Sequence, residues 1–241
     1  MSPAPPRRPT RVNRPTFVLI PGAGGRAWYW HRLVAELRAR GRAALAVDLP
    51  AGDDDAGFED YAAVVLDAAA DLDDIVVVAQ SLGGFTGPLV CAKRPVRELV
   101  LLNAMVPRPG ESGGQWWVNT GHDEARRAAA AREGWSLDLL ESFLHDLPPE
   151  VRAEAMAQGE PVQSGTPLVD PWPLPAWPDV PTRFVQGRDD RFFPVEFQRR
   201  VVAERLGIDV TEITGGHLVA LSRPRDLADA LDAVTSARYG R

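Results

Sequence analysis

Ser81 stands where the sequence predicts a sharp change from strand to helix. An apolar, mostly β-branched run, residues 75–79, ends just before Gln80 and Ser81, and a helix-compatible segment, residues 85–93, follows. This pattern predicts a tight turn that exposes the serine Oγ at the end of a sheet, near a helix N-terminus. Ala79 and Gly83 are small enough to let strand and helix approach closely. A serine held in this way can act as a nucleophile, although an ordinary strand end followed by a glycine turn has the same pattern.

A base and an acid that could activate this serine follow later in the chain. One predicted strand leads into Asp189 and Asp190, and a later one leads into His217 behind two glycines. Functional groups gather at the carboxyl ends of the strands in a parallel sheet. Serine, acid and histidine, in this order, predict a catalytic triad of Ser81, one of the two aspartates and His217.

A glycine-rich loop, residues 21–25, follows the first predicted strand. Glycines allow backbone N–H groups to point into a site, and we expect the amides of Ala23 and Leu82 to form an oxyanion hole. A loop of this kind could instead bind a dinucleotide, with Asp48 at the end of the second strand as the ribose ligand. The required Gly-x-Gly-x-x-Gly spacing is absent, however, and a bulky residue, Trp28, follows the loop.

Several other reactive or aromatic side chains are expected to lie at the surface or in the core rather than in a functional site. His122 and His145 lie in a polar segment, and we expect both at the surface. Cys91 follows Ser81 by about three helical turns and is expected in the core rather than in a site. Trp28 and Trp30 are expected to pack the first helix against the sheet.

Strands and helices alternate through most of the chain. Strands are predicted at 17–20, 43–47, 75–79, 96–102, 182–186 and 208–213, and helices at 28–40, 58–72, 85–93, 194–206 and 224–237. Continuously apolar strands separated by helices indicate a parallel sheet that is covered on both faces. We therefore expect an α/β fold with a mostly parallel, doubly wound sheet.

The alternation stops between residues 104 and 180. Helices are predicted at 124–133, 137–144 and 149–158, and a proline-rich stretch, 167–178, is expected to be extended. We interpret residues 104–180 as a helical lid on a core formed by residues 16–103 and 181–241. The lid is rich in tryptophan and is expected to carry specificity. The residues expected to line an apolar substrate pocket are Gly22, Trp117, Trp135, Phe143 and Leu218.

Composition excludes several classes of function. The chain has 241 residues, of which 45% are hydrophobic, enough for one sizeable core. A net charge of −6 disfavours binding to nucleic acid. The single cysteine fits a reducing compartment, and we expect a cytoplasmic monomer or homodimer without a membrane span. Residues 1–15 are predicted to form a disordered tail rich in proline and arginine.

Four motifs together resemble the α/β-hydrolase fold superfamily. They are FVLIPGAGGRAWYW (residues 17–30), AQSLGG (79–84), DRFFP (190–194) and GGHLVALSRP (215–224). The set is similar to the branch of plant methylesterases and hydroxynitrile lyases and their bacterial esterase relatives. This resemblance covers residues 16–237 and implies a helical lid, a small-molecule substrate, and no metal or organic cofactor.

The resemblance also bears on individual residues. The family places its acid immediately before an Arg-x-x-Pro segment, which favours Asp190 over Asp189. Pro21 stands where the family usually has histidine. The lyases carry a lysine directly after the catalytic histidine and a threonine in the first loop, whereas this chain has Leu218 and Gly22 there. Both differences argue against cyanohydrin cleavage.

We therefore expect a serine hydrolase that cleaves a small, partly apolar carboxylic ester, or a related acyl bond, through an acyl-enzyme. Two alternatives stay open from the sequence. One is a ligand-binding receptor or scaffold of the same fold with little turnover. The other is a lyase or carbon–carbon hydrolase that uses the same triad.

Overall fold

The computed structural model describes residues 14–236, so most of the predicted tail, residues 1–15, lies outside the described range. A six-stranded sheet of parallel strands runs in the order β2-β1-β3-β4-β5-β6, which confirms the predicted doubly wound α/β fold. The strands are β1 (Thr16–Ile20), β2 (Ala44–Ala46), β3 (Ile75–Gln80), β4 (Glu98–Leu102), β5 (Thr182–Gly187) and β6 (Val210–Ile213).

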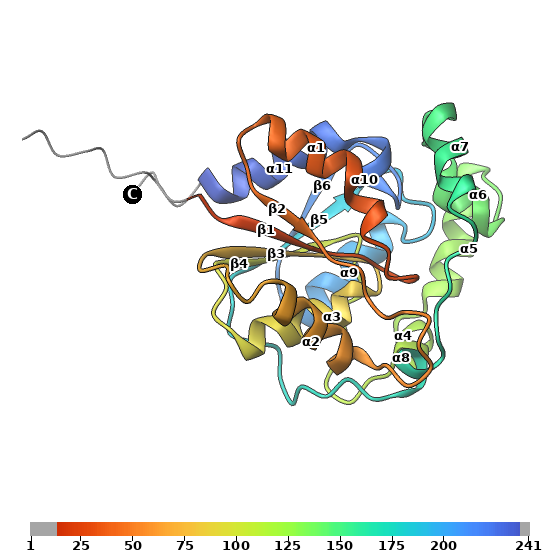
Figure 1. Ribbon diagram of the computed structural model, residues 1–241. Helices are drawn as coiled ribbons and strands as arrows, with labels where there is room; N and C mark the ends of the chain where they lie inside the picture. The colour runs from red at the N-terminus through yellow and green to blue at the C-terminus, as the bar shows by residue number, and fades with distance from the viewer. Residues whose placement is uncertain (1–13, 237–241) are drawn as a thin grey trace, which may run out of the picture.

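Helices cover both faces of the sheet (Figure 1). On one face lie α1 (His31–Ala39), α10 (Val219–Ser222) and α11 (Pro224–Ser236), and on the other α2 (Phe58–Ala68), α3 (Gly83–Lys93) and α9 (Val195–Leu206). Along β3, Val76 and Val78 pack in one apolar cluster, whereas Val77 and Ala79 pack in the other. Burial on both faces explains why this strand is apolar at every position rather than at alternate ones.

The segment between β4 and β5 holds α4 (Gly113–Thr120), α5 (His122–Glu133), α6 (Leu139–Leu144), α7 (Pro149–Ala157) and α8 (Thr166–Val169), and no strand forms within residues 103–181. These helices lie together beyond one end of the sheet (Figure 1). Helix α4 was not predicted, although Ser112 and Gln115 form a capping box at its start. The extended stretch predicted from residue 167 is wrong for its first three residues, because Pro167 lies in the first turn of α8, where proline is tolerated.

Within the described residues, the predicted helix ends lie within two residues of the structure except at α2, and one helix begins in a different conformation. The first begins as a 3₁₀ turn, η1 (Ala27–Trp30), before α1. Helix α2 was expected to reach residue 72, but it ends at Ala68. Asp71, Asp73 and Asp74 follow, and negative charge at a helix C-terminus opposes the helix dipole.

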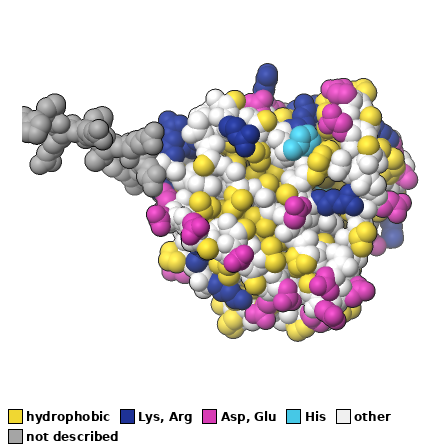
Figure 2. All heavy atoms as spheres, viewed as in Figure 1, with side chains coloured by type: hydrophobic (Ala, Val, Ile, Leu, Met, Phe, Trp, Pro, Cys, Tyr) yellow, Lys and Arg dark blue, Asp and Glu magenta, His cyan; other side chains and the backbone are white. Residues whose placement is uncertain are grey.

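Hydrophobic side chains lie across the middle of the face shown in Figure 2, and acidic side chains gather along its lower edge. Lys and Arg appear on this face as separate groups rather than as one patch. Among residues 14–236, no helix is both long and apolar enough to cross a membrane.

Helix α3 packs against β3 and against the loop after β4 through residues without bulky side chains. A Cβ atom placed on Gly84 would lie 1.9 Å from the Met105 carbonyl oxygen. A Cβ on Gly87 would lie 2.8 Å from the Cβ of Ala79. The methyl group of Ala79 therefore occupies space that Gly87 leaves empty.

We predict that Ala79 and Gly87 are energetically coupled. Gly87→Ala is expected to lower the free energy of unfolding by about 1–3 kcal/mol, because it adds a methyl group to a packed interface. In the double variant with Ala79→Gly, the loss should be smaller than the sum of the two single losses. Urea unfolding of the wild type and three variants measures this coupling. Additive losses would show that the two positions do not share one space.

Candidate active site

Ser81 lies in a strained turn directly after β3. Its φ is 53°, in the left-handed region that residues other than glycine rarely adopt. The Ser81 carbonyl oxygen accepts hydrogen bonds from the Gly84 and Met105 amides, at 3.0 and 2.9 Å. These bonds hold the turn and aim the side chain, so that Ser81 Oγ lies 3.0 Å from His217 Nε2.

His217 and Asp190 extend this contact into a buried chain of hydrogen bonds. His217 Nδ1 lies 2.8 Å from Asp190 Oδ2. The other carboxylate oxygen of Asp190 accepts the amides of Phe192 and Phe193, each at 2.8 Å. A carboxylate can only accept, so Nδ1 carries the imidazole proton and Nε2 is free to accept the serine hydroxyl. Ser81, His217 and Asp190 are 8%, 1% and 4% exposed, so the structure brings these three predicted residues together away from bulk water.

Asp189 has a different environment from Asp190. Its side chain is 46% exposed. Its Oδ2 accepts the Gly215 amide at 3.1 Å, which links the loop after β5 to the loop after β6. Asp189 therefore contacts the Gly215 amide, whereas Asp190 contacts the imidazole of His217.

Asn103, which was not identified from the sequence, also links the end of β5 to the loop after β6. It follows β4, is fully buried and has a φ of 44°. Its Nδ2 donates to the carbonyl oxygens of Gly216 and His217, both at 3.0 Å, and its Oδ1 accepts the Gly187 amide at 2.7 Å. Its position, as a polar residue directly after a buried strand, was the only feature of the sequence that could have pointed to this role.

The glycine-rich loop lies against the serine turn. A Cβ on Gly22 would lie 2.7 Å from Ser81 Cβ, so only glycine allows this approach. The Gly22 amide donates to Gln80 Oε1 at 3.1 Å, and Gln80 Nε2 donates to the His217 carbonyl at 3.4 Å. Within the described residues, no hydrogen bond is recorded from the amides of Ala23 or Leu82, the two predicted oxyanion donors. Both N–H groups are thus available to a ligand.

Aromatic rings surround the imidazole of His217. The rings of Phe143, Phe192 and Phe193 have their centroids 5.0 to 5.1 Å from it. Trp117 packs on Phe192, with centroids 5.6 Å apart. This apolar wall is built from both the β4–β5 segment and the loop after β5.

The five predicted pocket residues are not all in one place. Gly22 contacts the serine turn, Phe143 contacts His217, and Leu218 follows His217 at the start of α10. Trp117 packs on Phe192, which in turn packs on His217. The structure does not bring Trp135 to the serine: its indole lies beside the Arg191 guanidinium at 6.0 Å and donates to Glu133 at 3.3 Å.

His122 was expected at the surface, and that prediction is wrong. Its side chain is buried, and Nε2 donates to the Phe192 carbonyl at 2.7 Å. Burial lowers the pKa of His122 below 6.5, although hydrogen bonds to Phe192 and Asp123 act in the opposite direction. Its ring is packed among five others at centroid distances of 4.7 to 6.3 Å, those of Trp116, Trp117, Phe192, Phe193 and Phe197.

His145 and Asp146 lie between α6 and α7, next to the His217 loop. Asp146 Oδ2 accepts the Gly216 amide at 2.7 Å. Burial lowers the pKa of His145, which is half-buried rather than fully at the surface. Cys91 packs against the core as predicted, and burial raises the pKa of its thiol to about 12. A neutral thiol in that position is unreactive.

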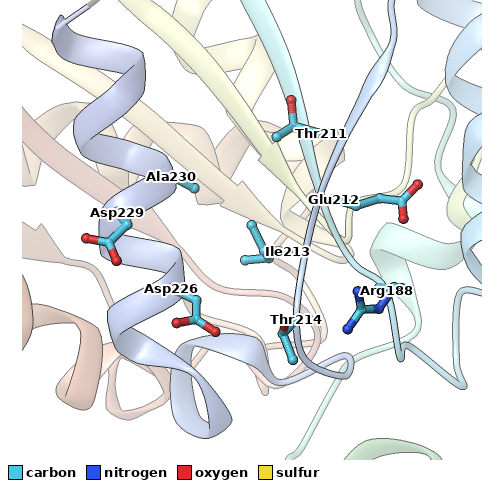
Figure 3. A pocket seen from close by; sticks show the side chains of 8 residues that line it. All are labelled: Arg188, Thr211, Glu212, Ile213, Thr214, Asp226, Asp229 and Ala230. Carbon is cyan, nitrogen blue, oxygen red and sulfur yellow. The ribbon is translucent and has the colours of Figure 1, made fainter.

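Ser81 lines neither of two cavities near this arrangement, although Asp190 lines one of them. One, of about 420 Å³, lies beside the acid loop, with Trp135, His145 and Arg191 in its wall. The other, of about 430 Å³, lies between β6 and α11 (Figure 3). Three of its four charged side chains pair with residues outside its wall: Arg188 contacts Asp189, Glu212 contacts Arg199, and Asp229 contacts Arg40. Among residues 14–236, no group of three or more His, Cys, Asp or Glu side chains is placed to hold a metal ion.

Comparison with known proteins agrees with this geometry. Residues 17–230 match the model of the alpha/beta hydrolase family. The chain belongs to this family. Probable esterase PIR7A from Oryza sativa subsp. indica is 31% identical, over 92% of this chain and 97% of its own length.

More distant relatives extend the comparison. Alpha-hydroxynitrile lyase from Arabidopsis thaliana is 23% identical, over 91% of this chain and 96% of its own. Among solved structures, an extracellular α/β-hydrolase from a Paenibacillus species superposes with a TM-score of 0.74 at 21% identity, covering 92% of this chain and 99% of its own. The predicted resemblance to the branch of plant esterases and hydroxynitrile lyases is confirmed.

We predict that His122 contributes to the loss of stability in acid. The pKa of His122 is lowered in the folded chain. Below pH 6.5 the unfolded chain therefore binds a proton that the folded chain does not, and the free energy of unfolding decreases as the pH decreases. Gln in place of His122 keeps an N–H donor for the Phe192 carbonyl but does not titrate. Denaturant unfolding at several pH values between 7.5 and 5 should therefore show a smaller decrease for His122→Gln than for the wild type. Equal decreases would exclude His122 as a source, since His145 is present in both proteins.

Proposed function

We propose that this α/β hydrolase cleaves a small, partly apolar carboxylic ester through an acyl-enzyme formed on Ser81. The observation that carries the proposal is the buried chain of hydrogen bonds from Ser81 Oγ through His217 to Asp190, at 3.0 and 2.8 Å. Membership of the α/β hydrolase family and the similarity to a probable esterase support the same reaction.

The first half of the reaction forms the acyl-enzyme. His217 Nε2 takes the proton of Ser81 Oγ as the oxygen attacks the ester carbonyl, and Asp190 stabilises the imidazolium that results. The carbonyl oxygen becomes an oxyanion, and the free amides of Ala23 and Leu82 donate to it. When the tetrahedral intermediate collapses, the carbon–oxygen bond to the alcohol breaks. His217 gives its proton to the departing alkoxide.

The second half regenerates the serine. Water loses a proton to His217 and attacks the acyl carbonyl, and the same two amides hold the second oxyanion. The bond between the acyl carbon and Ser81 Oγ breaks, and the proton returns from His217 to the serine oxygen. The carboxylic acid leaves, and none of these steps requires a metal or an organic cofactor.

Residues 104–180 serve in this proposal as a lid on the core formed by residues 16–103 and 181–241. Phe143 from the lid and Phe192 from the core are in contact next to His217, with ring centroids 4.6 Å apart. Their apolar surface favours a substrate with an apolar group close to the scissile bond. Leu218 and Gly22 offer no charged or hydroxyl group for a cyanide leaving group, which favours ester hydrolysis over cyanohydrin cleavage.

The test of the nucleophile is labelling with a fluorophosphonate, followed by mass mapping and assays on a panel of chromogenic esters. We expect one adduct on Ser81 in the wild type, none in Ser81→Ala, and ester turnover by the wild type alone. Labelling without turnover would favour the receptor or scaffold alternative. Retro-addition products without an acyl-enzyme would favour the lyase or carbon–carbon hydrolase alternative.

The acid is tested by Asp190→Asn. An asparagine amide cannot hold the His217 tautomer that accepts the serine proton, and the corresponding change in another serine hydrolase lowers kcat by about 10⁴-fold. We expect a loss of about 10³- to 10⁴-fold in kcat, with KM much less affected. Asp189→Asn is the matched control, since Asp189 contacts the Gly215 amide rather than His217. A larger loss in the control would reassign the acid.

A further inference from the structure

A short segment of the chain, residues 158–164, crosses the glycine-rich loop. This strap connects α7 to α8, and it contacts Gly24 of the loop and Arg26, the residue that follows the loop. The guanidinium of Arg26 donates to the carbonyl oxygens of Gln158 and Glu160. Pro161 lies directly on Gly24, where a Cβ atom would be 2.4 Å from the Pro161 Cβ. Only glycine at position 24 allows the strap to lie so close.

Gln163 makes the central polar contact of the strap. Its Oε1 accepts the Gly24 amide at 3.1 Å, and its Nε2 donates to the Tyr61 hydroxyl at 3.1 Å and to the Ser164 carbonyl at 3.3 Å. The reverse orientation of the side-chain amide would place Nε2 against the Gly24 N–H, two donors facing each other. The Gly24 N–H, which can only donate, and the Ser164 carbonyl, which can only accept, therefore direct the oxygen of Gln163 toward the loop.

Two glutamines thus hold the peptide groups on either side of the Ala23 amide. Gln80 accepts the Gly22 N–H, and Gln163 accepts the Gly24 N–H. Between them, the Ala23 N–H has no recorded acceptor among the described residues. The peptide group that carries the Ala23 N–H is itself held at its carbonyl end, since the Gly22 oxygen accepts the Gly25 amide at 3.1 Å. Because this group is planar, that bond and the two glutamines on either side leave the Ala23 N–H little freedom of direction. Gln80 belongs to β3 of the core, whereas Gln163 belongs to the strap.

We propose that Gln163 is a positioning residue: it fixes the direction of the Ala23 N–H, so that the oxyanion hole is complete only while the strap is docked. This inference rests on the proposed function and adds a coupling between the strap and the chemical step. An oxyanion donor acts through its alignment with the transition state, so loss of alignment lowers kcat more than it raises KM.

The anchoring of the strap permits it to detach and dock again. Residues 157–162 are exposed, and Val162 is 63% exposed, so opening this stretch exposes little additional apolar surface. The next anchors toward α8 are the Ser164 amide, which donates to the Ala51 carbonyl at 2.7 Å, and Pro167, which is buried. Segments with few buried contacts open at a small free-energy cost. When the strap is open, the Gly24 amide loses its acceptor.

The experiment compares Gln163→Met with Tyr61→Phe. Methionine has a similar length but no acceptor for the Gly24 amide, whereas Tyr61→Phe removes only the bond that Gln163 makes to α2. With an ester that the wild type hydrolyses, we expect Gln163→Met to lower kcat by about 10-fold or more, less than the loss of an oxyanion donor itself. KM should change by less than about threefold, and Tyr61→Phe should stay within about threefold of the wild type in kcat.

A second measurement separates positioning from general damage to the fold. A trifluoromethyl ketone forms a tetrahedral adduct with a serine oxygen, and its negative oxygen requires the same donors as the transition state. Its inhibition constant should rise for Gln163→Met by the same factor as kcat falls. Arg26→Met, which loosens the strap without touching Gln163, should shift both values in the same direction. Thermal unfolding identifies any variant that has failed to fold.

Three results would overturn the proposal. They are a kcat for Gln163→Met within twofold of the wild type, an equal loss in Tyr61→Phe, or a loss confined to KM. If the wild type hydrolyses no ester, the proposed function fails separately. Amide hydrogen exchange at Gly24, measured by NMR, then tests the contact itself: faster exchange in Gln163→Met than in Tyr61→Phe supports it, and equal exchange rejects it.

Discussion

The side-chain amide of Asn103 is the constraint on which the rest of this site depends. It accepts from the end of β5 and donates twice to the loop after β6, in a place that water does not reach. The loops that carry Asp190 and His217 are thereby held at one separation. Without these bonds, the Gly187 amide and the Gly216 carbonyl would be buried without partners, at a cost of about 1–3 kcal/mol each. The left-handed backbone of Asn103, one residue type that tolerates this conformation, makes the three contacts possible.

The β4–β5 segment makes polar contacts with each of the loops that meet at Ser81. His122 contacts the acid loop through the Phe192 carbonyl, Asp146 contacts the histidine loop through the Gly216 amide, and Gln163 contacts the glycine-rich loop through the Gly24 amide. A covering element that only excluded water would need apolar contacts alone. These three bonds instead tie its position to that of the reacting groups.

Much of the fold could be predicted from the sequence, because the strands are continuous apolar runs and the helices between them are amphipathic or capped. Ser81, Asp190 and His217 could be predicted because each lies in the turn or loop after a strand and the three residue types form a catalytic pattern. Asn103 and Gln163 could not be predicted, since a side-chain amide belongs to no such pattern and the loops that they bind lie more than 80 residues away in the chain. The burial of His122 was missed because its helix is polar, and only the tertiary structure reveals the aromatic rings around it.

Strands β4 and β5 are neighbours in the sheet, although the whole segment of residues 103–181 separates them in the chain. The entropy lost in closing such a loop grows only with the logarithm of its length, by about 0.6 kcal/mol for each doubling. Against a typical stability of about 5–15 kcal/mol, this is a small penalty. The length of this segment therefore costs the sheet little, whereas its packing matters: Trp116 and Trp172 are buried in the same apolar cluster as Val77 of β3. A change in this segment is therefore transmitted to the rest of the chain through specific contacts rather than through its length: through buried indoles to the sheet, and through single hydrogen bonds to the three loops.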